Sequence, residues 1–404
     1  MVDSGGELAP TALAELMPWA VRGIRTGRSW VLAADPEVLD ERWRRLAAAA
    51  PAQQAELFEI SRSRTPDSAV AALPGQAGGS TRRLSREPGP RPPLVRVRHR
   101  PLDRAWLLAD QRLLDQARPE LWRAAGPRQR YLLVQPVLAS ASAAADAPGP
   151  TVTVAAELPV DHRVTVHPLH RRPEGHEPNL TPGLLPFLAR TLATRVTAED
   201  VLAWTTAVTA RPDAPRRPDG SPLVPLPRSA ATWAEGVSLG HRLLDLHTFA
   251  RPGLRLPDGR RSFIRQAVDR QPAGIDYDAE TETLLLGEGR LAPVSPAAGR
   301  SPVLREWFAE RAAFRTAPSG TLQALGLTSW PQRASTELIE LASTLAHLAE
   351  LRPLQDALAA EGGPWLGRSE LHAAGVLPVL PAARRPASVL GSLEEGPEGQ
   401  YALL

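Results

Sequence analysis

The fold of this chain is decided by residues 95–124, which read VRVRHRPLDRAWLLADQRLLDQARPELWRA. The apolar Val95 and Val97 alternate with Arg96 and Arg98, and this period of two is typical of a β-strand. Further β-like runs occupy residues 104–110, 128–135, 151–158 and 163–169. We therefore predict a mixed or antiparallel sheet across residues 94–170, and we expect its exposed face to carry arginine.

Arginine supplies the whole Lys+Arg total of 47, because the sequence contains no lysine. Its planar guanidinium pairs bidentately with phosphate and with the O6/N7 edge of guanine. Thirteen arginines stand against five acidic residues between positions 82 and 130, whereas eight stand against eleven from position 301 onward. This asymmetry indicates one face that meets a polyphosphate. The alternatives are a solvated charged face and a compositional bias from GC-rich coding.

The composition excludes several classes of site and location. The 404 residues include no cysteine, so disulfides, thiolate zinc sites and cysteine nucleophiles are excluded. The first residues, MVDSGGELAP, lack the apolar core of a signal peptide, and no apolar run reaches about 18 residues. We therefore expect a cytoplasmic protein that does not enter a membrane.

The chain divides into four predicted segments, and its fold class is predicted to be α+β. Residues 1–61 read as mainly helical, with Asp35 as an N-cap before Pro36. The 42 prolines and 30 glycines predict long loops. Residues 62–93 are predicted to be a Pro/Gly/Arg-rich linker, either a tether or a basic arm. A mixed-sheet body with C-terminal helices spans 94–360, and a Pro/Gly-rich tail spans 361–404.

More detailed patterns predict individual helices and a hairpin within the body. Helices are predicted after Thr197, from Ser229 to Phe249, at about 301–315 and at about 331–360. A small hairpin is predicted from residue 275 to residue 289.

Three clusters of polar residues in the sequence are candidates for a metal-binding or catalytic site. His162, His167, His170 and His176 lie close in sequence, but none forms an i,i+4 pair and no cysteine completes a zinc set. The alternating acids of residues 276–282 lack the glycine that a calcium loop needs at its sixth position. We therefore predict no metal site.

His241, Asp245 and His247 fall on one predicted helix, and an enzyme using them remains the third interpretation of this chain. Against enzymatic function, the sequence has no GxxxxGK[ST] loop, no GxGxxG and no GxSxG. We therefore expect a protein that is not an enzyme and that uses no cofactor.

Several phrases, taken in order, resemble the C-terminal specificity (target-recognition) region of type ISP single-polypeptide restriction–modification enzymes. The resemblance covers about residues 15–360. The phrases are Met17-Pro18-Trp19, Arg28-Ser29-Trp30-Val31, Pro36-Glu37-Val38-Leu39 with Arg42-Trp43, residues 99–105 (HRPLDRA), residues 118–121 (RPEL), residues 178–182 (PNLTP), residues 196–201 (VTAEDV), residues 239–247 (LGHRLLDLH), residues 275–278 (IDYD) and residues 303–308 (VLREWF).

Some features depart from the family pattern. His99 stands where the family has tyrosine, and Leu102 stands where it has phenylalanine. The loop at residues 211–227 is proline-rich and shorter than in the family. The nuclease, translocase and methyltransferase parts of the family's enzymes are not in this sequence, so the resemblance implies no catalytic activity.

The resemblance implies a DNA-binding specificity subunit that presents double-stranded DNA to a separate adenine methyltransferase, which would dock near residues 1–61. We predict that seven arginines contact the backbone or read bases: Arg96, Arg98, Arg100, Arg104, Arg112, Arg128 and Arg130. For Arg100, Asp103 and Arg104 the alternative is an internal, salt-bridged corner. A second interpretation of the whole chain is an inactive protein that binds a methyltransferase without reading DNA.

Overall fold

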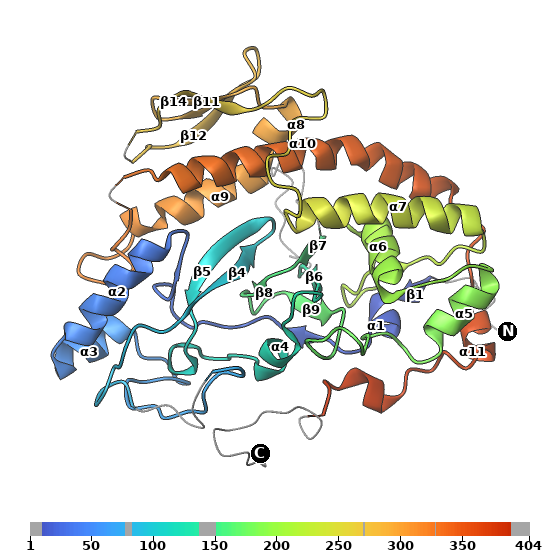
Figure 1. Cartoon of the computed structure of the whole chain (residues 1–404), viewed down its shortest axis with the longest axis horizontal. Helices are drawn as coiled ribbons and strands as arrows, with labels where there is room; N and C mark the ends of the chain where they lie inside the picture. Colours follow the sequence, from blue (N-terminus) through green and yellow to red (C-terminus); the bar gives the residue numbers. More distant parts are fainter. Residues whose placement is uncertain (1–9, 77–82, 137–150, 270, 328, 389–404) are drawn as a thin grey trace.

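The computed structural model describes residues 10–76, 83–136, 151–269, 271–327 and 329–388 (Figure 1). Its helices are α1 (Leu13–Leu16), α2 (Pro36–Ala48), α3 (Pro51–Phe58), α4 (Pro119–Ala124), α5 (Leu184–Thr191), α6 (Ala198–Thr209), α7 (Ala230–His247), α8 (Pro296–Gly299), α9 (Pro302–Ala312), α10 (Gln332–Glu361) and α11 (Arg368–Ala373). Its strands are β1 (Thr11–Ala12), β2 (Val21–Arg22), β3 (Leu32–Ala33), β4 (Leu94–Arg100), β5 (Asp103–Leu108), β6 (Tyr131–Val134), β7 (Val152–Ala155), β8 (Leu158–Pro159), β9 (Thr165–Pro168), β10 (Leu223–Val224), β11 (Phe263–Gln266), β12 (Ile275–Asp278), β13 (Thr283–Leu286) and β14 (Gly289–Ala292). The predicted α+β class and the C-terminal helices are confirmed.

Two four-stranded sheets form the centre of the molecule. One has the order β3-β5-β4-β8 and the other has the order β2-β9-β6-β7. Every pair in them is antiparallel except β4 with β8. The predicted β-runs are all strands, but they divide between two sheets instead of forming one. The N-terminal segment, predicted as helical, also supplies an edge strand to each sheet.

A third antiparallel sheet, of order β11-β14-β13-β12, covers the C-terminal helices (top of Figure 1). Its inward residues Leu284, Leu286 and Leu291 are buried in one apolar core with Leu338 and Leu341 of α10. The hairpin predicted at 275–289 is present as β12, β13 and the start of β14. Both closing helices also form where the periodicity predicts them.

Helices α6 and α7 form the other large layer, and their starts follow local capping chemistry. The Thr197 hydroxyl accepts from the Asp200 amide, and the Asp200 carboxylate accepts from the Thr197 amide. The two helices approach closely at Gly240. A Cβ at this position would lie 1.9 Å from the Ala203 carbonyl oxygen. Only glycine therefore permits this spacing.

The tip of the β4–β5 hairpin belongs to a different core from its stem. Val97 and Leu107 pack with the N-terminal helices, whereas Leu102 packs with α9 and α10. Leu102 has φ of 55° and is only 2% exposed. Burial of the Leu102 side chain stabilises the fold by about 2 kcal/mol, which offsets the energetic cost of the left-handed backbone at this residue. The hairpin thus joins two cores.

The segments predicted as linker and tail both pack onto the body. Leu73 and Leu84, from residues 62–93, are buried in the core that contains Trp30 and Phe58. Between residue 361 and residue 388, α11 forms, and Leu371 is buried against the core beneath α6. These two segments therefore bury more apolar side chains than their Pro- and Gly-rich composition indicates. The four-segment division itself stays a prediction.

Candidate nucleic-acid interface

Three of the four arginines of the β4–β5 hairpin, Arg96, Arg98 and Arg104, are covered by partners from α7 and α10 or by Glu157, while Arg100 pairs with Glu310 of α9. Arg96 pairs with Glu337 and stacks on Trp106, while Arg104 lies 2.8 Å from a Glu340 oxygen. Glu337 and Glu340 come from α10. The expectation of an exposed arginine face is therefore wrong, because this helix places its carboxylates over the sheet.

Arg98 is the most enclosed of the hairpin arginines. Its Nη2 donates to Glu157 at 3.0 Å and to the His247 carbonyl at 3.0 Å, and its side chain is 2% exposed. The Phe249 ring lies under the guanidiniums of both Arg98 and Arg104. This stack closes the space between the sheet and the end of α7.

The hairpin turn is an internal, salt-bridged corner at Asp103. Its carboxylate accepts from Arg311 Nη1 at 3.0 Å, and Arg311 also donates to Glu337 at 2.9 Å. The Arg311 guanidinium lies 3.6 Å from the centre of the Trp307 ring. Both side chains of the Asp103–Arg311 pair are at most 4% exposed. For Asp103 the structure thus agrees with the alternative interpretation, an internal, salt-bridged corner.

The three remaining predicted arginines lie outside the hairpin. Arg112 is buried and binds the Asp110 carboxylate through Nε and Nη2. Arg128 is 55% exposed and pairs with Glu199 at 2.8 Å. Arg130 donates to the carbonyls of Pro127 and Gln129. Contact of these arginines with DNA stays a prediction.

A groove of about 540 Å³ runs between the N-terminal segment, the hairpin and the end of α9. Seven arginines and four carboxylates line it. The lining arginines are Arg25, Arg28, Arg42, Arg100, Arg104, Arg163 and Arg311, and the carboxylates are Asp35, Asp103, Asp161 and Glu310. Of the seven predicted arginines, only Arg100 and Arg104 line this groove.

Glu310 anchors one wall of the groove. Its oxygens bind His99 Nε2 at 3.2 Å and Arg100 Nη2 at 2.9 Å. The hydrogen bond from His99 and the charge of Arg100 lower the pKa of Glu310 to about 2, although burial opposes the change. This carboxylate therefore stays ionised and holds the side chains of His99 and Arg100 in place.

Arg42 lines the groove and forms no ion pair with a carboxylate among the described residues, although the charge of Glu59 acts on it. It is 5% exposed and donates five hydrogen bonds to backbone carbonyls. Its acceptors are the carbonyls of Trp30, Leu32, Gln323 and Leu325. Burial lowers its pKa to about 10, which leaves it charged at neutral pH. The residue therefore ties α2 to two groove-lining loops and adds a positive charge.

The edge of the groove beside Glu310 carries the basic residues Arg25, His162 and Arg163, with Arg22 next to them on β2, and the sequence-based prediction of DNA contacts missed all four. Arg22 and Arg25 lie on and just after β2, and His162 and Arg163 lie in the turn between β8 and β9. All four side chains are exposed. They are about 140 residues apart in sequence, so only the pairing of β2 with β9 brings them together. No local sequence pattern indicates that these residues lie together.

The histidine candidates do not converge. His167 is buried and donates from Nδ1 to the Met17 carbonyl at 2.8 Å, and His247 accepts from the Val154 amide at 3.2 Å. Burial lowers the pKa of His167 to about 4 and that of His247 to about 3. His241 instead faces Asp200, at 3.4 Å. Within the described residues, no three His, Asp or Glu side chains form a group suited to a metal ion.

The acidic hairpin edge is accounted for by a turn. Asp278 accepts from the amide of Glu280 at 2.9 Å and from the Thr281 hydroxyl at 2.6 Å. Its oxygens therefore satisfy the local chain, as in an Asx turn.

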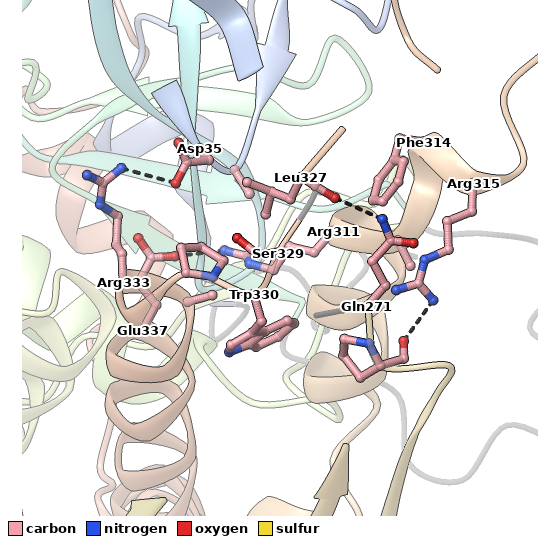
Figure 2. A pocket seen from close by; sticks show the side chains of 15 residues that line it. Asp35, Gln271, Arg311, Phe314, Arg315, Leu327, Ser329, Trp330, Arg333 and Glu337 are labelled. Atoms are coloured by element: carbon pink, nitrogen blue, oxygen red, sulfur yellow. Dashed lines mark hydrogen bonds and ion pairs between the residues drawn. The ribbon is translucent and has the colours of Figure 1, made fainter. Parts of the chain in front are cut away.

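A small cavity beside Trp330 offers no ligand site (Figure 2). Its volume is about 20 Å³, which suits one water molecule. Figure 2 shows Arg333 reaching Asp35, and Arg311 beside Glu337, so these four charged side chains are already paired.

No helix in the described ranges has the length and apolar character needed to cross a membrane.

Comparisons with solved structures show a shared fold. The cryo-EM structure of a DrdV–DNA complex matches with a TM-score of 0.53 and 14% identity, covering 88% of this chain and 39% of that one. A nuclease-deletion mutant of the Type ISP restriction-modification enzyme LlaGI, in complex with a DNA substrate mimic, matches with a TM-score of 0.50 and 12% identity over 89% of this chain and 29% of that one. The ATP-dependent Type ISP restriction-modification enzyme LlaBIII, bound to DNA, matches with a TM-score of 0.52 and 11% identity over 87% and 23%.

This chain thus spans between 23% and 39% of the length of those solved chains. None of the curated proteins matches the sequence. The family model described as the Type ISP C-terminal specificity domain matches residues 15–341, which is most of the chain and close to the extent of the resemblance noted in the sequence. The protein therefore belongs to the Type ISP C-terminal specificity domain family.

Proposed function

We propose that this protein recognises a sequence in double-stranded DNA and acts as the specificity part of a restriction–modification system. The observation that carries the proposal is the family membership over residues 15–341. Support comes from three fold neighbours that were solved with DNA or a DNA mimic. The groove lined by seven arginines and four carboxylates adds electrostatic support.

In this proposal the predicted arginines have different roles. Arg100, at the groove, the exposed Arg128 and the partly buried Arg130 contact DNA directly. Arg98 and Arg112 are enclosed by partners within the protein, so they shape the interface without touching DNA. Arg96 and Arg104, each 21% exposed, hold α10 on the sheet.

We further propose that an adenine methyltransferase on a separate chain docks near residues 1–61 and receives the DNA. The support is the resemblance of Met17-Pro18-Trp19 and Arg28-Ser29-Trp30-Val31 to the stretch that joins methyltransferase and specificity region in type ISP enzymes. The protein itself performs no catalysis in this proposal, and it acts in the cytoplasm.

The test is selection from a random-sequence duplex DNA library at roughly physiological salt, with and without the partner methyltransferase. An enriched motif is expected, and the affinity for that motif should fall steeply as salt rises. Enrichment only in the presence of the methyltransferase would assign part of the readout to the complex. No salt-dependent binding in either condition would refute the proposal and favour an interaction protein that binds a methyltransferase without reading DNA.

A further inference from the structure

The rim of the groove is a single rigid unit made from two distant segments. Arg22 of β2 pairs in register with Thr165 of β9, and its Nη1 donates to the Arg163 carbonyl at 2.6 Å. A Cβ at Gly23 would lie 2.3 Å from the Asp161 carbonyl oxygen, so the two backbones touch there. This unit, the basic rim, consists of Arg22, Arg25, His162 and Arg163.

The carboxylates near the basic rim are already neutralised. The Asp161 carboxylate accepts from Nη2 of Arg163 at 2.7 Å and from the backbone amide of Arg163, and its side chain is 14% exposed. Glu310 is held by His99 and Arg100. The other two carboxylates that line the groove bind elsewhere, Asp35 at the start of α2 and Asp103 to Arg311.

Two of the rim cations have no such compensation. The Arg25 side chain has no hydrogen-bond or ion-pair partner among the described residues, although its backbone pairs with Gln116. In the part of the chain that the structure describes, Arg22 donates to the Arg163 carbonyl and to no carboxylate. The groove edge is therefore positive, and its free charges point into solvent.

We propose that the basic rim binds the phosphate backbone of duplex DNA and so sets the position of the DNA in the groove. This inference rests on the proposed function and names the surface on which it operates. Side chains that are exposed and spread along two segments suit a polyanion on the surface, since a small free anion is usually enclosed by convergent donors. Phosphate contacts of this kind fix register without reading sequence.

The partly buried wall across the groove complements this role. Gln323 and the exposed Ser29 hydrogen-bond to each other there, between the loop after α9 and the loop before β3. Amide and hydroxyl groups are the kind that contact base edges. In this proposal the basic rim holds the backbone, and Ser29 and Gln323 face the bases.

The test is DNA binding by the full chain as a function of salt, using the selected motif and an unrelated duplex. Arg25→Gln and Arg163→Ala are compared with Arg195→Ala, an exposed arginine in the loop between α5 and α6. Each rim variant should lower the slope of log K against log salt by about 1 and the affinity by about fivefold at 0.15 M salt, equally for both duplexes. Arg163→Lys, which keeps the charge, should restore most of the slope.

Four outcomes separate the claims. If Arg25→Gln and Arg163→Ala behave like Arg195→Ala while the wild type binds DNA in a salt-dependent way, the basic rim is wrong and the proposed function stands. A loss that affects only the selected motif would also overturn it, because a base reader acts in that way. Wild-type protein that binds no DNA would overturn both. RNA bound with the same rim dependence but more tightly than duplex DNA would replace DNA by RNA.

Discussion

Replacing Arg42 with leucine should loosen the loops that line the groove. Arg42 makes five hydrogen bonds to four backbone carbonyls, at 2.7 to 3.3 Å, and these carbonyls are its hydrogen-bond acceptors among the described residues. At about 1 kcal/mol net per bond, their loss amounts to about 5 kcal/mol. Removing a desolvated charge returns part of this, so we expect a net loss of about 3 kcal/mol.

Hydrogen exchange followed by mass spectrometry measures the effect where it arises. The amides of Leu32 and Leu325 are hydrogen-bonded to Ser29 and Leu322, and peptides that contain them report local opening. A loss of about 3 kcal/mol raises their exchange rate roughly 100-fold. Arg42→Lys should recover little, because one ammonium cannot reach four separated carbonyls.

Arg44→Leu is the matched control on the same helix. Its side chain is 70% exposed and pairs only with Glu41, so its loss should cost less than about 0.5 kcal/mol. Equal exchange rates in the Arg42 and Arg44 variants would show that the carbonyl contacts do not hold the loops, and the reasoning would fail.

Two further predictions concern the body of the fold. Gly240→Ala should lower the midpoint of thermal unfolding by several degrees, because the new Cβ would lie 1.9 Å from the Ala203 carbonyl oxygen. Gly274→Ala is the control, because a Cβ there meets nothing within 4 Å, and it should change the midpoint little. Equal shifts in the two variants would contradict the close packing at Gly240. The pKa values of His247 and His167 lie near 3 and 4, below the unfolded value of 6.5, so the folded state binds fewer protons. Stability should therefore fall as pH drops from 6.5 toward 5, by up to about 1.4 kcal/mol per pH unit for each histidine. Urea unfolding at several pH values should show a shallower fall for His247→Gln, and an unchanged slope would exclude His247 as a source.

Local patterns in the sequence predicted much of the secondary structure. Asp35 caps α2 and Thr197 caps α6 as expected, and Ser229, where a helix was predicted to begin, caps α7, since a cap depends on residues within one turn. The β-runs were also recognised, because alternation is local. Their division between two sheets was not, since it depends on edge strands from residues 21–22 and 32–33, which are too short to carry a pattern.

The candidate site was predictable only in part. The sequence shows a dense run of arginines, but it does not show that Glu337 and Glu340, more than 230 residues away, occupy two of them. The basic rim could not be predicted, because no sequence pattern singles out Arg25 or Arg163. Only strand pairing brings their two segments together. Charge density along the chain therefore predicts a basic surface, but it does not predict which arginines remain exposed on that surface.

The hairpin that joins two cores also has a consequence for synthesis on the ribosome. The partners of Asp103 and Arg96 lie 208 and 241 residues downstream. At about 5–20 residues per second, the hairpin waits roughly 10–50 s for the helices that neutralise its arginines and receive Leu102. During that time its cations and its apolar tip are open to other molecules, including ribosomal RNA. Completion of α10 ends this exposure, so the last long helix to be made is also the one that closes the fold.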